Sequence, residues 1–146
     1  MPVERPGWEE YFLGMADLVA RRSTCPRRQV GAVLVRDERV IATGYNGSPR
    51  DQPHCSEVGC LMVDGHCKRT VHAEMNALLQ CACHGVASRG ATLFTTSFPC
   101  LDCAKAIVQA GVEELVFRDA YPDTHSRAVL EAAGIRLRVA AAGGTR

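Results

Sequence analysis

Residues 72–74 read His-Ala-Glu, and residues 99–103 read Pro-Cys-Leu-Asp-Cys. These two motifs decide the fold class, because each opens a segment whose apolar residues have helical spacing. The first segment runs over 71–83, and the second begins at Pro99, whose missing N–H costs nothing in the first turn of a helix. Residues 91–96 lie between the two segments and predict a strand.

The rest of the chain continues this alternation. In the segment 8–22, apolar residues recur at three- and four-residue steps and predict one face of a helix: Trp8, Tyr11, Phe12, Met15, Leu18 and Val19. The other predicted elements are a β-hairpin of 30–35 and 39–45, strands at 112–118 and 135–139, and a helix at 126–133. Helices that alternate with strands predict an α/β fold, and we expect a three-layer α/β/α sandwich with a mixed five-stranded sheet.

Length and composition fit one domain over 1–146, with a Cys-rich insertion loop at 46–69 and a flexible tail at 140–146. Lys plus Arg number 17 and Asp plus Glu 16, and the resulting net charge of +1 argues against a protein that coats nucleic acid. No apolar run approaches the ~20 residues of a membrane span. Because residues 1–10 also lack the apolar core of a secretory signal, we expect a cytoplasmic protein.

His72, Cys100 and Cys103 form the first candidate metal site. The two cysteines are three residues apart, so they share one face of the helix that Pro99 opens. The positive end of the helix dipole favours thiolates there. Two thiolates and one imidazole suit Zn²⁺. Three protein ligands leave the fourth tetrahedral position to water, which is typical of a catalytic zinc site.

Glu74 completes this pattern as a proton carrier rather than as a ligand. Two thiolates already balance the charge of Zn²⁺, and a fourth anionic ligand would close the site. We expect a zinc-bound water to be the nucleophile and Glu74 to carry protons to a ring nitrogen and to the departing ammonia. The H-x-E…P-C-x-x-C pattern is typical of zinc nucleobase deaminases. The alternative, a structural zinc site or a redox pair, would need no glutamate.

These residues resemble the deoxycytidylate (dCMP) deaminase family, and most of all its bacterial branch, which includes the ComE operon deaminases. The resemblance covers roughly 8–139 and rests on the stretches 20–25, 30–33, 44–49, 54–55, 59–60, 66–67, 69–77 and 98–100. It implies the cytidine deaminase fold, hydrolysis of dCMP to dUMP for thymidylate synthesis, a homohexamer, and dCTP and dTTP as effectors. Cys83 departs from the family pattern, because relatives often carry Lys or Arg at that position.

The resemblance also assigns contacts to the base and the sugar. Asn46 is expected to hydrogen-bond the sugar or the base, and the backbone N–H of Ala73 is expected to meet the pyrimidine carbonyl. Phe98 is similar to a residue that lines the base pocket, and Tyr121 is expected at the pocket mouth. Two alternatives remain open, because Asn-Gly is also a plain turn signal and both aromatic residues could belong to the core.

A nucleotide phosphate needs cationic partners, and an arginine fork suits it. Arg27 has the best family match, while Arg28 and Arg50 are further candidates. The alternative for each of them is an ordinary solvated surface charge.

The remaining cysteines predict a second, structural zinc. Cys55, Cys60 and Cys67 fall in the 46–69 segment, and a closed four-ligand site would hold such a loop together. Some dCMP deaminases, by the resemblance, carry zinc on the equivalents of Cys25 and Cys55. We expect Cys25, Cys55, Cys60 and Cys67 as ligands, with His66 as the substitute for one of them. The alternative is a set of buried free thiols or an oxidisable pair.

Three other functions stay open at this point. One is deamination of adenosine or cytosine in nucleic acid, which would need a basic channel and is disfavoured by the net charge. Another is deamination of a free nucleoside or a different cytosine nucleotide. The third is a non-catalytic, zinc-stabilised competence accessory protein, which would not need Glu74.

Overall fold

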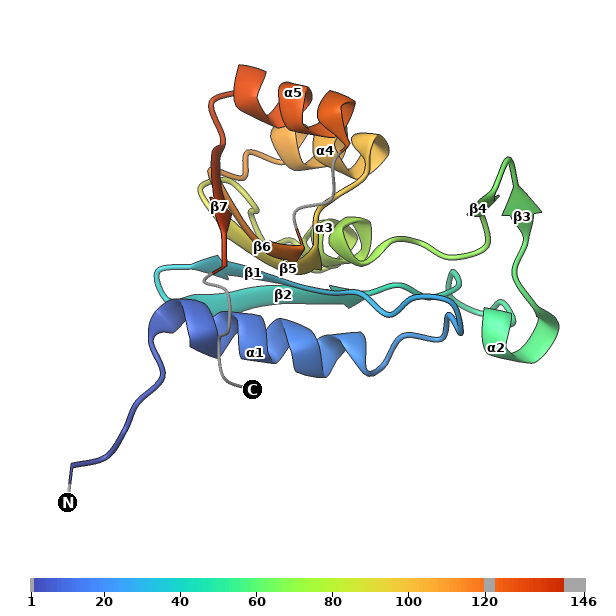
Figure 1. Cartoon of the computed structure of the whole chain (residues 1–146), viewed down its shortest axis with the longest axis horizontal. Coiled ribbons are helices and arrows are strands. Elements are labelled where there is room, and N and C mark those ends of the chain that lie inside the picture. Colours follow the sequence, from blue (N-terminus) through green and yellow to red (C-terminus); the bar gives the residue numbers. More distant parts are fainter. Residues whose placement is uncertain (1, 120–122, 141–146) are drawn as a thin grey trace.

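The structure, a computed structural model, describes residues 2–119 and 123–140. The helices are α1 (Trp8–Ala20), α2 (Cys55–Val58), α3 (Ala73–His84), α4 (Leu101–Gln109) and α5 (Thr124–Ala132). The strands are β1 (Gly31–Arg36), β2 (Arg39–Tyr45), β3 (Met62–Val63), β4 (His66–Cys67), β5 (Thr92–Ser97), β6 (Glu114–Asp119) and β7 (Arg136–Val139) (Figure 1). None of the described helices is long and apolar enough to cross a membrane.

Five strands form the central sheet in the order β2-β1-β5-β6-β7. The first three strands are antiparallel neighbours, whereas β5, β6 and β7 run parallel. This mixed five-stranded sheet is the one that the sequence predicts. The crossover that brings β5 beside β1 contains α3, and the next crossover contains α4. Both helices therefore begin near the same region of the sheet.

The sheet lies between two helical layers (Figure 1). Helix α1 covers one face and packs Phe12, Leu13 and Ala16 against a small apolar cluster of β1, β5 and β6. Helices α3, α4 and α5 cover the other face, and their apolar side chains join a larger core. The expected three-layer sandwich is confirmed.

Two glycines allow the helices to approach the hairpin closely from opposite faces. A Cβ built on Gly31 would lie 2.0 Å from the carbonyl oxygen of Ala16 in α1. A Cβ on Gly44 would lie 2.2 Å from the carbonyl oxygen of Ala73 and 2.4 Å from the nitrogen of Ala77, both in α3. Only the absence of a side chain at these two positions permits the observed packing.

Several sequence predictions need correction. Helix α3 begins at Ala73 rather than at 71, and α4 begins at Leu101 rather than at Pro99, because each cap residue keeps an extended backbone. The 46–69 segment is not without structure, since it contains α2 and the β3–β4 hairpin. The apolar face predicted for the first helix is divided, because Phe12 is buried whereas Trp8 and Leu18 are exposed. In the predicted tail at 140–146, only Ala140 lies within the described residues.

Candidate active site

The starts of α3 and α4 meet at one place, although 28 residues separate their caps. His72 is the N-cap of α3 and Cys100 is the N-cap of α4. The Nδ1 atom of His72 lies 3.4 Å from Sγ of Cys100 and 3.5 Å from Sγ of Cys103. All three donor atoms lie within 4.8 Å of one another. Two sulfurs and one nitrogen at this spacing form a donor set that fits Zn²⁺.

Hydrogen bonds fix both helix starts. The side-chain amide of Asn76, in the first turns of α3, donates to the carbonyl oxygen of Tyr45 at 2.8 Å and so ties α3 to the end of β2. The buried hydroxyl of Ser126 donates to the carbonyl oxygen of Pro99 at 2.7 Å, which holds the turn before α4 against α5. The positions of the candidate ligands therefore depend on residues from several distant elements.

The thiols at the start of α4 have strongly shifted pKa values. Hydrogen bonds from Cys103 and His72 lower the pKa of the Cys100 thiol to about 4, although burial opposes the shift. The bond to Cys100, together with burial, raises the pKa of Cys103. The same contact with Cys100 raises the pKa of His72. Cys100 therefore carries thiolate at neutral pH, which is the form that binds metal ions.

Glu74 lies in the first turn of α3, close enough to His72 and Cys100 for their charges to act on it, and only 4% of its surface is exposed. Burial raises its pKa to about 7, although its own backbone N–H and the nearby His72 oppose this. A carboxyl group with such a pKa can take up and release a proton near neutral pH, as a general acid–base requires.

A cavity of about 600 Å³ opens onto these residues. Its lining includes Ala73, Glu74 and Phe98. Ala73 is the first residue of α3, and the first N–H groups of a helix have no partner inside the helix, so they can bind a ligand. Phe98 is both a core and a cavity residue, because its ring also packs edge-to-face on Phe117 with 4.8 Å between centroids.

Asn46 lines the same cavity but also has a structural role. Its side-chain oxygen accepts from the N–H of Val30 at 2.9 Å, and its Nδ2 donates to the carbonyl oxygen of Arg28 at 2.8 Å. These bonds fix the segment that leads into β1. A side-chain amide has two N–H groups and two acceptor positions, so one of each is left for a ligand.

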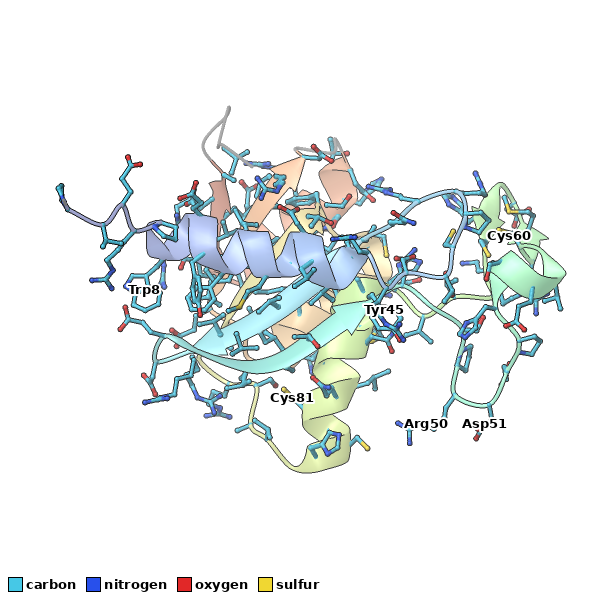
Figure 2. The ribbon with its side chains drawn as sticks, turned by 90° about the horizontal axis from the view of Figure 1, so that it is seen from below. Trp8, Tyr45, Arg50, Asp51, Cys60 and Cys81 are labelled. Atoms are coloured by element: carbon cyan, nitrogen blue, oxygen red, sulfur yellow. The ribbon has the colours of Figure 1, made fainter. Side chains whose placement is uncertain are left out.

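Cationic residues contribute to the lining of the cavity. Arg27, Arg28 and Lys68 line it, and Arg28 also donates to the hydroxyl of Ser97. Sequence reasoning missed Lys68, because nothing local distinguishes it from a surface lysine. Arg50, a phosphate candidate from sequence, is not among the lining residues, and it lies at an exposed turn (Figure 2). Tyr121 lies outside the described residues.

A second group of cysteines lies in the inserted segment. The Sγ atoms of Cys55, Cys60 and Cys67 lie within 4.8 Å of one another, and those of Cys55 and Cys67 are 3.6 Å apart. Cys55 opens α2, Cys60 follows that helix, and Cys67 lies in β4. Cys25 is buried and close enough for its charge to affect the Cys60 thiol, but it is not within the 4.8 Å group. The exposed His66 is not in that group either.

The backbone around Cys67 favours the thiolate. Burial acts against ionisation, but hydrogen bonds from the backbone at Arg69, Leu61 and Thr70 lower the pKa of Cys67 to about 7. A sulfur held by several backbone N–H groups beside two further thiols is a suitable metal ligand.

Comparison with known proteins agrees with this geometry. Residues 6–119 match the family model for the cytidine and deoxycytidylate deaminase zinc-binding region. The chain belongs to this family. The matched range includes both cysteine groups, Glu74 and most of the cavity lining.

Individual members of the family support the assignment. ComE operon protein 2 of Bacillus subtilis is 50% identical over 137 residues, which are 92% of this chain and 72% of that protein. The deoxycytidylate deaminase of Schizosaccharomyces pombe is 44% identical over 143 residues, but the chain spans only 44% of its length. The dCMP deaminase of cyanophage S-TIM5, crystallised with dCMP and dUMP, aligns with a TM-score of 0.83 at 34% identity, over 94% of this chain and 100% of that one.

Proposed function

We propose that this deaminase-family protein hydrolyses dCMP to dUMP and ammonia. The observation that carries the proposal is one cavity whose lining includes the buried Glu74, two residues of the three-donor metal site (His72 and Cys100) and cationic side chains. The similar proteins named deoxycytidylate deaminase and the cyanophage structure with dCMP and dUMP support the same substrate.

His72, Cys100 and Cys103 would hold the zinc ion. Zinc on such ligands acts as a Lewis acid that makes water a competent nucleophile near neutral pH. Because His72 caps α3, Cys100 caps α4 and Cys103 lies in the first turn of α4, the starts of two helices would set the position of the metal. The ion pair between Lys105 and Asp102, at 3.4 Å, lies on the exposed side of the same turn.

Glu74 would move the protons of the reaction. Its carboxylate takes a proton from the attacking water and delivers it to a ring nitrogen of cytosine, while the hydroxyl oxygen bonds to the carbon that carries the amine. The remaining hydroxyl proton then passes through Glu74 to the amine, the carbon–nitrogen bond breaks, and ammonia leaves. The products are the uracil nucleotide and an unchanged carboxylate, so atoms and charge balance.

Different residues of the cavity would bind the base, the sugar and the phosphate of the substrate. The N–H of Ala73 donates to the pyrimidine carbonyl, and the ring of Phe98 supports the base. The remaining amide positions of Asn46 meet the sugar. Arg27 and Lys68, which both line the cavity, hold the phosphate.

The second cysteine group would bind a structural zinc. Cys55, Cys60 and Cys67 supply three sulfurs within 4.8 Å, and the fourth predicted ligand is the buried Cys25, whose charge affects the Cys60 thiol. Such a metal would stabilise the β3–β4 hairpin that precedes Lys68. The homohexamer, the response to dCTP and dTTP, and the cytoplasmic location remain predictions from sequence.

Ammonia release from dCMP, compared with cytidine, deoxycytidine, CMP and dCTP, tests the function. We expect a strong preference for dCMP. Lys68→Gln should raise KM for dCMP about tenfold and leave KM for deoxycytidine unchanged, because only dCMP carries the phosphate. Arg50→Gln is the control for loss of a positive charge, because Arg50 is exposed and is not in the cavity lining. Activity only on deoxycytidine, or on an oligonucleotide, would reject the proposal.

A further inference from the structure

The β3–β4 hairpin borders the cavity, although it projects beyond the end of the central sheet (Figure 1). Four consecutive residues of this region line the cavity: Gly65, His66, Cys67 and Lys68. The segment between α1 and β1 contributes Arg27 to the same lining. The inserted segment and the body of the protein therefore form this part of the cavity together.

One contact joins the hairpin to an arginine of the lining. Nη1 of Arg27 donates to Sδ of Met62 at 2.9 Å, although the two residues are 35 positions apart in the chain. Met62 lies in β3, and both side chains are exposed. Met62 is outside the cavity lining, so it contacts from outside an arginine that lines the cavity.

A thioether is suited to orienting this arginine. It is a weak acceptor, and a guanidinium has five N–H groups, so the contact with Met62 leaves the other four for a ligand. An exposed arginine without such a contact samples many rotamers, and a ligand that binds it must also order it. The contact between Arg27 and Met62 removes part of this cost before the ligand binds.

Met62 is itself held in place by the hairpin. It pairs with Cys67 across the two strands, and the N–H of Lys68 donates to the carbonyl oxygen of Leu61 at 2.7 Å. Cys60 and Cys67, which belong to the second cysteine group, lie at the two ends of the hairpin. The hairpin therefore presents Met62 to Arg27 and also brings Lys68 to the cavity.

We propose that Met62 is a positioning residue for the phosphate of the substrate. It acts through Arg27, whose guanidinium it orients at the cavity, and it favours a nucleotide over a nucleoside without taking part in the chemistry. The inference rests on the proposed function, because it takes Arg27 as a ligand of the dCMP phosphate. The inserted segment thereby contributes to substrate specificity, whereas the starts of α3 and α4 carry the reacting groups.

Ammonia release from dCMP and from deoxycytidine tests this role. Met62→Ala should raise KM for dCMP about fivefold, which reflects the cost of ordering one long side chain, and should leave kcat and the KM for deoxycytidine at wild-type values. Met62→Gln keeps the length of the side chain and supplies an oxygen acceptor, so its KM for dCMP should stay within about twofold of wild type.

Val63→Ala is the matched control. Val63 is 44% exposed against 46% for Met62, and as the next residue of the strand it points to the other face. This variant should keep the wild-type KM for dCMP. In an Arg27→Gln background, where KM for dCMP is already raised, Met62→Ala should have no further effect, because Met62 acts through Arg27.

Four results would overturn the inference and leave the proposed function intact, provided that wild type prefers dCMP. They are an unchanged KM for dCMP in Met62→Ala, an equal rise in Val63→Ala, a Met62→Gln variant as impaired as Met62→Ala, and a full effect of Met62→Ala in the Arg27→Gln background. A wild type that does not prefer dCMP to deoxycytidine would instead reject the proposed function, and this inference with it.

Discussion

Replacing Gly44 by alanine should displace the start of α3 and with it the candidate active site. The new Cβ would lie 2.2 Å from the carbonyl oxygen of Ala73, one residue before Glu74 and one after His72. Ordinary contact begins near 3.4 Å, so strand and helix must separate by about 1 Å. A displacement of that size in catalytic groups can cost about 100-fold in rate.

The same overlap should lower stability. Overpacking in a core costs about 3 kcal/mol at the upper end of its usual range. For a domain of this size that corresponds to a fall in Tm of about 10 °C. We therefore expect Gly44→Ala to lower both kcat for dCMP, measured by ammonia release, and Tm, measured by calorimetry.

Gly31→Ala is the matched control. Its Cβ would lie 2.0 Å from the carbonyl oxygen of Ala16, so it strains the contact of α1 with the opposite face of the same hairpin. We expect a similar fall in Tm with kcat close to wild type below the transition, because α1 carries no candidate catalytic residue. Wild-type kcat and Tm in Gly44→Ala, or an equal loss of kcat in Gly31→Ala, would refute the reasoning.

Three other outcomes follow from the site. Glu74→Gln should lower kcat by about 1000-fold and retain zinc, measured by elemental analysis, because the amide cannot carry protons; full activity would exclude the assigned role. Cys60→Ser should lower the zinc content from two ions per chain to one and reduce Tm, whereas Cys83→Ser, an exposed cysteine outside both groups, should change neither. Asn46→Ala should destabilise the fold by about 2 kcal/mol in urea titrations, because the N–H of Val30 loses its acceptor; an unchanged midpoint would argue that water replaces the amide.

Local patterns in the sequence were enough to predict the helices and strands of the sandwich and the catalytic zinc site. Periodicity and turn residues predicted the helices and strands of the central sandwich, because each is set by neighbours a few positions apart. The spacing of Cys100 and Cys103, and the His-Ala-Glu motif, indicated a catalytic zinc site for the same reason. The sequence did not predict the exact first residues of α3 and α4. His72 and Cys100 are cap residues with an extended backbone, and the spacing of apolar residues does not reveal such caps.

Only the tertiary structure decided how distant segments meet. The order β2-β1-β5-β6-β7 brings the starts of α3 and α4 together, and it places Lys68 beside the cavity. The packing of α1 on the sheet buries Phe12 and leaves Trp8 exposed, although both residues belong to one predicted apolar stripe. These outcomes depend on close packing between elements, as at Gly44, where the space for a helix is set by residues 29 positions or more away in the chain. No local pattern contains that information, because it arises only when the layers pack.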